Sequence, residues 1–285
     1  MTAQQSPIPM AHRRSGRERV LERGLIYACA VLLALFVLVP IYLIAVSAFT
    51  PRERAFDFPR SVIPSEVSVD TILFFLNASG VMESFWRSVI VALMTLGLSL
   101  AIGAPAGYAL ARYVFRGRNA YRLVVLSTRA FPIVILAIPL AVTYRAWGID
   151  DTVIGVALMH TALALPFTVL ITSSVFISVP RELEEAAQTL GCNPLQAFLR
   201  VSLPLALPGL AAAAIFTWVL SWNDVFAAVI LTLREPTLPA RILSALTQSP
   251  IYFQFAAGFV MLVPSLVVIF FIRKYLLGLW GRVVK

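Results

Sequence analysis

Six apolar segments, each long enough to cross a lipid bilayer as an α-helix, constrain this chain more than any other feature. They lie at residues 25–49, 89–111, 123–144, 152–179, 205–232 and 251–272. A helix needs roughly 20 residues to span the hydrocarbon core, whereas a strand of a membrane β-barrel needs only ~10. Hydrophobic residues make up 60% of the 285-residue sequence and charged residues 13%, which excludes a soluble domain with a polar surface. The sequence therefore predicts an all-α polytopic membrane protein with six transmembrane helices.

Basic residues are distributed unequally between the two sides of the predicted bundle. With an even number of spans, the N-terminal segment, the second-to-third connection and the C-terminal tail lie on one side. Their basic residues are Arg13, Arg14, Arg17, Arg19, Arg23, Arg112, Arg116, Arg118, Arg122, Arg273, Lys274, Arg282 and Lys285. On the other side, seven arginines are offset by eight acidic residues. The positive-inside rule therefore predicts that both termini are cytoplasmic, and this asymmetry accounts for the net charge of +9 without a nucleic-acid partner.

The cytoplasmic connection at residues 180–204 begins with the pattern of a short helix. Pro180 suits its first turn, where a missing N–H is not needed, and three acidic residues place negative charge at the positive end of the helix dipole. These acidic residues are Glu182, Glu184 and Glu185. An apolar stripe on the other side is formed at helical spacing by Leu183, Ala186, Ala187 and Leu190.

A second helix is predicted directly after the first. Gly191 ends the first helix, and Asn193 followed by Pro194, with Gln196 three residues after the Asn, has the pattern of an N-cap. A helix lying on the lipid surface is the alternative interpretation, but such helices carry Lys and Arg on the polar face rather than three Glu. We therefore interpret this hairpin as a docking site for a soluble cytoplasmic partner.

The same segment resembles the EAA loop of ABC importer permeases, the subunits that dock onto cytoplasmic ATPases. The shared pattern is Glu185-Ala186-Ala187, three residues, Gly191, nine residues and then Val201-Ser202-Leu203-Pro204, with Val201 in place of the usual Ile. The resemblance covers residues from about 85 to the C-terminus and implies the type I ABC importer permease fold. The residues that it implies for coupling to the ATPase are Glu184, Glu185, Ala186, Ala187, Gly191 and Pro204.

The apolar segments predict a simple division of the chain. A disordered cytoplasmic tail without apolar periodicity precedes a retained first span, which is too long for a signal peptide, and an external loop with short helices at 70–76 and 81–86 follows it. A five-helix permease core and a cytoplasmic C-terminal tail complete the chain. The boundaries are 1–24 for the first tail, 25–49 for the first span, 50–87 for the external loop, 88–272 for the core including the 180–204 loop, and 273–285 for the last tail.

The fifth predicted span carries a second resemblance. Residues 217–224, with the sequence Thr-Trp-Val-Leu-Ser-Trp-Asn-Asp, resemble the Trp-Asn-Asp/Glu segment of the carbohydrate uptake family, which contains the second permease subunit of the maltose importer. The ending at residues 278–285 is similar to the Gly-Leu-x-x-Gly-x-Val-Lys ending of these subunits, although Trp280 and Arg282 are unusual. Arg87-Ser88 stands where this family tends to have Asn-Ser.

The residues of this span form a candidate solute pathway or gate. Thr217, Ser221 and Asp224 fall at i, i+4 and i+7, and Trp218 and Trp222 form an adjoining aromatic edge that can stack on a sugar ring. Other members of the candidate set are Asn223 and His160, which is predicted to lie at the depth of Asp224 in the external half of a central cavity. A polar clamp between helices, or to a partner permease, remains the alternative for these residues.

Residues for catalysis or metal binding are not grouped in this sequence. The two lysines, Lys274 and Lys285, belong to no phosphate-binding Gly-x-x-x-x-Gly-Lys-Ser/Thr loop, and two histidines without a Cys/His cluster do not predict a metal site. Cys29 and Cys192 lie in different segments and predict no disulfide. We expect no catalytic residue, no metal ligand and no cofactor in this chain, with ATP and Mg²⁺ bound by a separate ATPase.

The expected function is that of a non-enzymatic permease subunit of a binding-protein-dependent ABC importer in a prokaryotic cytoplasmic membrane. It would move a sugar, polyol or similar polar solute by alternating access, together with a second permease subunit, two ATPase subunits and an external solute-binding protein. One alternative is an ABC permease for phosphate, peptide or amino acid. The other is an ion-coupled carrier with Asp224, Arg129 and His160 as a relay, but a carrier has no use for the hairpin and the chain lacks two related halves.

Overall fold

The computed structural model describes residues 16–57, 62–63, 66–246 and 248–283, and these residues form helices and connections without a strand. Helices α1 to α6 are α1 (Gly16–Ala48), α2 (Asp70–Leu76), α3 (Val81–Arg112), α4 (Arg118–Ser127), α5 (Ile133–Trp147) and α6 (Val153–Ser178). Helices α7 to α12 are α7 (Arg181–Thr189), α8 (Pro194–Ala197), α9 (Leu203–Asn223), α10 (Phe226–Leu231), α11 (Leu238–Leu246) and α12 (Ile251–Val283). Short 3-10 turns are η1 (Arg52–Arg54) and η2 (Thr128–Ala130), and η3 (Phe198–Ser202) is a π-helical turn.

Five helices among the described residues are long and apolar enough to cross a membrane, and the count is up to six if one bent pair is a single span. The all-α polytopic fold is therefore confirmed. The predicted third span at 123–144 is not one continuous helix, because α4 and α5 meet at 91°. Phe131 is extended at the break, and Pro132 follows it without an N–H to donate. A proline disfavours helical geometry in the residue before it, which accounts for a break at this position.

The predicted fifth span at 205–232 also consists of two helices. α9 ends at Asn223, and Asp224 has extended backbone angles. The Asp224 carboxylate accepts a hydrogen bond of 3.0 Å from the backbone N–H of Ala227 in α10. Asp224 is thus a residue of the break, rather than a member of a continuous helical stripe with Thr217 and Ser221.

Several segment boundaries in the structure differ from the predicted ones. α1 begins at Gly16, so the disordered tail predicted for 1–24 is wrong from that residue on, and residues 1–15 lie outside the described residues. The predicted short helix at 70–76 is confirmed as α2, whereas the one predicted at 81–86 is the first part of α3. α12 continues through most of the predicted C-terminal tail to Val283. α11 was not predicted.

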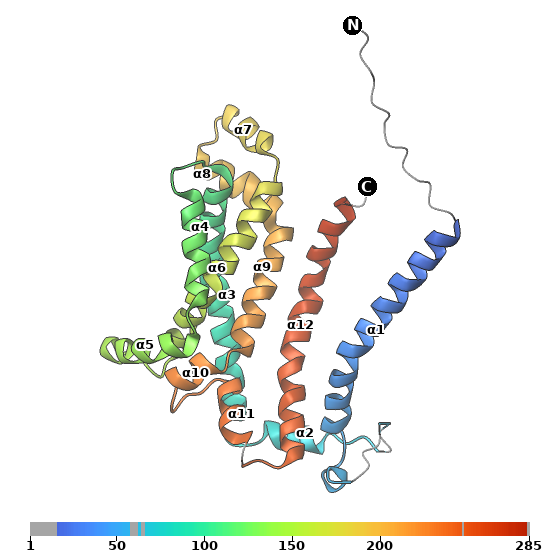
Figure 1. The fold of residues 1–285 in the computed structure, drawn as a ribbon. Coiled ribbons are helices and arrows are strands. Elements are labelled where there is room, and N and C mark those ends of the chain that lie inside the picture. Colours follow the sequence, from blue (N-terminus) through green and yellow to red (C-terminus); the bar gives the residue numbers. More distant parts are fainter. Residues whose placement is uncertain (1–15, 58–61, 64–65, 247, 284–285) are drawn as a thin grey trace.

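The central packing unit is formed by α3, α6 and α9 (Figure 1). Small residues allow α3 and α6 to approach closely, because a Cβ atom at Gly103 would lie 2.6 Å from Thr168 and one at Gly107 would lie 2.7 Å from the backbone nitrogen of Ser173. Thr172 Oγ1 donates a hydrogen bond of 2.8 Å to the carbonyl oxygen of Gly103 across this contact. Small residues thus allow close packing between these two helices.

The other helices are arranged around this unit. α12 contacts both α9 and α1, and α1 is inclined away from the central unit toward its N-terminal end (Figure 1). α7 and α8 lie at one end of the bundle, whereas α2 and α11 lie at the opposite end (Figure 1). The hairpin of α7 and α8 and the break at Asp224 are therefore separated along the long axis of the bundle.

Candidate functional site

The hairpin predicted at residues 180–204 is confirmed in its local geometry. Gly191 has a φ of +94°, in the left-handed region that favours glycine, and an added Cβ atom would meet nothing within 4 Å. Glycine is therefore required there for its backbone angles rather than for space. Asn193 and Gln196 form a capping box, with 2.8 Å from Gln196 N to Asn193 Oδ1 and 3.0 Å from Asn193 N to Gln196 Oε1.

Four leucines of this hairpin are exposed in the described chain. The exposed fractions are 45% for Leu183, 87% for Leu190, 64% for Leu195 and 49% for Leu199. Leucines so exposed on one hairpin indicate a surface that another protein covers. Among the other predicted coupling residues, Glu185, Ala186 and Pro204 are exposed and Ala187 is half-buried.

Glu184 differs from the other two acidic residues of α7 because it is 4% exposed and points into the protein. Its Oε1 atom accepts a hydrogen bond of 2.7 Å from Arg112 Nε at the end of α3, and its Oε2 atom accepts one of 2.8 Å from the hydroxyl of Tyr108. Arg112 also donates a hydrogen bond of 2.9 Å to the carbonyl oxygen of Val179, which follows α6. The prediction that Glu184 lies on the polar side of this helix with Glu182 and Glu185 is therefore wrong.

The electrostatics of this contact keep Glu184 ionised. Burial by itself raises the pKa of the Glu184 carboxyl, but the hydrogen bonds from Arg112 and Tyr108 and the positive charge of Arg112 outweigh it, so the pKa lies below its ordinary value of 4.5. No local pattern around Glu184 signals this role, because Arg112 lies 72 residues earlier in the sequence.

A second polar group joins α3, α6 and α9 near the opposite end of the bundle. His160 Nε2 lies 3.2 Å from Asp224 Oδ2, and His160 Nδ1 lies 2.8 Å from Ser221 Oγ. Ser221 Oγ donates in turn to Thr95 Oγ1 at 3.3 Å. The side chain of His160 is 1% exposed and that of Asp224 is 13% exposed, so the group is buried at the histidine and partly exposed at the carboxylate. The prediction that His160 and Asp224 lie at one level is confirmed by their contact.

The tryptophans of α9 belong to the packed core. The rings of Trp218 and Trp222 stack on each other with centroids 5.8 Å apart and an interplanar angle of 6°, and both are buried. Trp222 Nε1 donates a hydrogen bond of 2.9 Å to the carbonyl oxygen of Met261 in α12. These rings are covered in this conformation, so they present no open edge to a solute.

The remaining candidate residues divide between the core and the surface. Thr217 is buried and lies 3.1 Å from Thr168 between hydroxyl oxygens, whereas Asn223 is exposed and donates to the carbonyl oxygen of Val219 at 2.8 Å. The arrangement favours a clamp between helices for Thr217, and a role of Asn223 or Asp224 in a solute pathway stays a prediction.

Arg129 belongs to neither polar group. Its guanidinium lies over the ring of Phe167, 4.5 Å from the centroid. The described hydrogen bonds of Asp224 go to His160 and Ala227 rather than to Arg129. The described residues also contain no group of three or more His, Cys, Asp or Glu side chains able to hold a metal ion.

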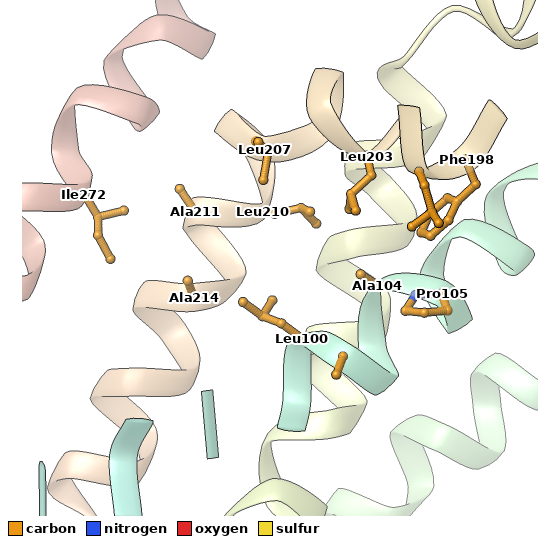
Figure 2. Close-up of a pocket in the computed structure, with 12 residues that line it drawn as sticks. Leu100, Ala104, Pro105, Phe198, Leu203, Leu207, Leu210, Ala211, Ala214 and Ile272 are labelled. Carbon is orange, nitrogen blue, oxygen red and sulfur yellow. The ribbon is translucent and has the colours of Figure 1, made fainter. Parts of the chain in front are cut away.

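An apolar groove of about 620 Å³ lies between α3, η3, α9 and α12 (Figure 2). Figure 2 shows Leu207, Ala211 and Ala214 on the side of α9 that is nearer to Ile272 of α12, with Leu100 of α3 below them. No charged or hydrogen-bonding side chain lines this groove, so it is unsuited to a sugar, whose hydroxyl groups need partners when they leave water.

Residues 99–277 match the family described as binding-protein-dependent transport system inner membrane component. The chain belongs to this family. Among family relatives, the trehalose transport system permease protein SugB of Mycobacterium tuberculosis is 32% identical over 257 residues, which cover 88% of this chain and 93% of SugB. The diacetylchitobiose uptake system permease protein NgcG of Streptomyces coelicolor is 31% identical over 258 residues, which cover 88% and 85% of the two chains.

Solved structures of importers show the same fold. A bacterial ABC transporter involved in the import of the acidic polysaccharide alginate has a chain with a TM-score of 0.70 and 22% identity, and the match covers 95% of this chain and all of that chain. The MetNI methionine ABC transporter in an inward-facing conformation has a chain with a TM-score of 0.58 and 22% identity, with coverage of 71% and 97%. The permease fold expected from the hairpin is therefore confirmed.

Proposed function

We propose that this chain is a permease subunit of a binding-protein-dependent ABC importer that moves a sugar or related polar solute across a bacterial cytoplasmic membrane. The observation that carries the proposal is the hairpin of α7 and α8, whose turn is held by Gly191 and whose leucines are exposed. Family relatives named for trehalose, diacetylchitobiose and α-glucoside transport support a sugar as the solute.

The proposed mechanism is alternating access driven by a partner. Two ATPase subunits bind ATP and Mg²⁺, and their closure moves the α7 surface of this chain and the equivalent surface of a second permease subunit. Rigid rotation of the helices then turns a central cavity from the outside to the cytoplasm. ATP drives this change only because it binds the two states with different affinity. An external binding protein delivers the solute, and this chain performs no chemistry itself.

The ATPase contact is tested by co-purification. Leu190→Glu places a charge at the centre of the exposed leucine surface, and Val114→Glu is the control, because Leu190 is 87% exposed and Val114 is 90% exposed on the connection after α3. We expect Leu190→Glu to insert in the membrane and to lose the ATPase, while Val114→Glu retains it. Retention of the ATPase by both variants would remove the hairpin from the interface.

The solute is tested on the binding protein that acts with this permease. A thermal-shift screen with trehalose, diacetylchitobiose, other disaccharides and polyols is expected to give at least one large increase in melting temperature, because a bound ligand stabilises the folded state. If only phosphate, a peptide or an amino acid stabilises the binding protein, the importer function of this chain still holds, but its solute is not a sugar.

A further inference from the structure

Three elements of the chain meet at the buried pair of Arg112 and Glu184, because Arg112 bonds both the Glu184 carboxylate and the carbonyl oxygen of Val179. Arg112 and Tyr108 come from the last turns of α3, Glu184 comes from α7, and the carbonyl oxygen of Val179 comes from the residue after α6. The Tyr108 ring also packs against Phe198 of η3, with 4.6 Å between centroids. The hairpin is therefore attached to two membrane helices through one small group of side chains.

This contact resists displacement because it is buried. The side chains of Arg112 and Glu184 are 9% and 5% exposed. Removal of one partner from a buried ion pair leaves an uncompensated charge away from water, which is strongly unfavourable. Sliding of α7 past the end of α3 would separate the same charges, so the contact favours a joint movement of the two helices.

Another ion pair on α7 provides the contrast. Arg181 and Glu185 lie 3.1 Å apart one helical turn from each other, but their side chains are 66% and 62% exposed. Exposed pairs of this kind contribute little and exchange partners readily. Glu185 is thus available to a partner protein, whereas Glu184 is already engaged within this chain.

We propose that Glu184, Arg112 and Tyr108 form a joint that makes α7 and the cytoplasmic end of α3 move as one body. The inference rests on the proposed function, since the displacement is attributed to the ATPase. α3 also carries Thr95, which accepts a hydrogen bond from Ser221 in the polar group of His160 and Asp224. Movement of α7 is therefore delivered through α3 to the opposite end of the bundle. Glu184 acts in this joint as a positioning residue.

Distance measurements between spin labels test the joint directly. One label replaces Gln188 on α7 and the other replaces Val114, two residues beyond α3, in the complete complex with Cys29 and Cys192 changed to Ser. We expect the distance to be the same without nucleotide and with ATP plus EDTA, and to become nucleotide-dependent in Glu184→Gln. A nucleotide-dependent distance in the unmutated joint, or an unchanged distance in Glu184→Gln, would overturn the proposal.

Transport coupling provides a second readout in proteoliposomes. The sugar that most stabilises the binding protein in the screen above is used as the radiolabelled probe. Glu184→Gln and Arg112→Gln are expected to keep the ATPase bound but to lower sugar uptake per ATP hydrolysed by about fivefold or more, a typical size for coupled sites. Tyr108→Phe removes one hydrogen bond and keeps the ring, so a smaller loss is expected.

The control is Arg116→Gln, which removes an exposed arginine from the connection after α3. This variant is expected to take up as much sugar per ATP hydrolysed as the unmutated protein. The joint would be contradicted if Glu184→Gln and Arg112→Gln took up as much sugar per ATP hydrolysed as the unmutated protein. It would also be contradicted if both variants lost the ATPase, because the ion pair would then serve assembly. Failure of the proposed function is distinguishable, since the unmutated complex would then show no ATP-dependent sugar uptake while the spin-label distances still report on the joint.

Discussion

His160 Nε2 lies 3.2 Å from Asp224 Oδ2, so a side chain within α6 contacts the residue that directly follows α9. The same carboxylate oxygen accepts the backbone N–H of Ala227 at the start of α10. One side chain thus holds the break in the fifth span and fastens it to α6. This arrangement favours the clamp between helices over an open solute contact.

Loss of His160 should destabilise the protein. His160→Leu leaves the Asp224 carboxylate and the Ser221 hydroxyl without this partner at a buried site, and an unsatisfied buried group costs about 1–3 kcal/mol or more. Thermal unfolding of the purified protein should show a lower midpoint. Arg145→Gln is the control, because its pair with Asp150 is exposed, and it should change stability by no more than about 1 kcal/mol.

The variant Asp224→Asn distinguishes two roles for this residue, a clamp between helices and a direct contact with solute. The clamp predicts a lower melting temperature with an unchanged KM for solute uptake, because the carboxylate is engaged by His160 and Ala227. A changed KM at unchanged stability would instead place Asp224 in the solute pathway.

Two glycines of α3 should respond in opposite ways to alanine. A Cβ atom at Gly107 would lie 2.7 Å from the backbone nitrogen of Ser173, so Gly107→Ala is expected to cost about 1–3 kcal/mol through forced separation of α3 and α6. Gly97 has nothing within 4 Å of an added Cβ, and Gly97→Ala should be neutral or stabilising by up to about 1 kcal/mol. Melting temperatures of the two variants check this order, and equal shifts would refute the close contact.

The ion pair of Glu184 predicts a specific dependence on pH. Because the pKa of Glu184 is lowered in the folded protein, its stabilising contribution is fully present above the ordinary value of 4.5 and is lost as the pH falls through the lower folded value. The difference in melting temperature between the unmutated protein and Glu184→Gln should be constant from neutral pH down to the ordinary carboxyl value and should narrow below it. A difference that narrows near neutral pH would point to another group.

The membrane orientation rests on the arginine asymmetry. Fusions of a cytoplasmic fluorescent reporter at Arg118, Leu190 and the C-terminus should be active, whereas an alkaline phosphatase reporter should be active near Ile63 and Leu238. Phosphatase activity at Leu190 would place the hairpin outside the cell and would exclude an ATPase contact.

Local signals in the sequence predicted local structure well. The end of α7 at Gly191 and the capping box at Asn193 depend on residues within one or two turns, and the hairpin was therefore predictable. The break before Pro132 was not, because membrane helices also accommodate proline without ending. α3 and α6 continue through Pro105 and Pro166. Packing around each proline decides between the two outcomes, and a single sequence does not specify that packing.

The candidate sites could be predicted only in part, because they depend on contacts between residues far apart in the sequence. Which acidic residue of α7 turns inward depends on Arg112, which is distant in sequence, and periodicity alone placed Glu184 with Glu182 and Glu185. The sequence predicted an aromatic edge formed by the tryptophans of α9, but both rings are buried, and Trp222 bonds to Met261 of α12. Counting residues from the helix ends did predict one long-range relationship, namely that His160 and Asp224 lie at the same level of the bundle.

Sugar uptake by the complete reconstituted complex tests the central claim most directly. Proteoliposomes containing both permease subunits and the ATPase, with the binding protein outside, should accumulate the sugar identified in the thermal-shift screen only when ATP and Mg²⁺ are inside. Accumulation should persist when ionophores abolish all ion gradients, and it should be lost in Leu190→Glu. Uptake that continues without ATP and stops when the ion gradients are abolished would contradict the account and would identify an ion-coupled carrier.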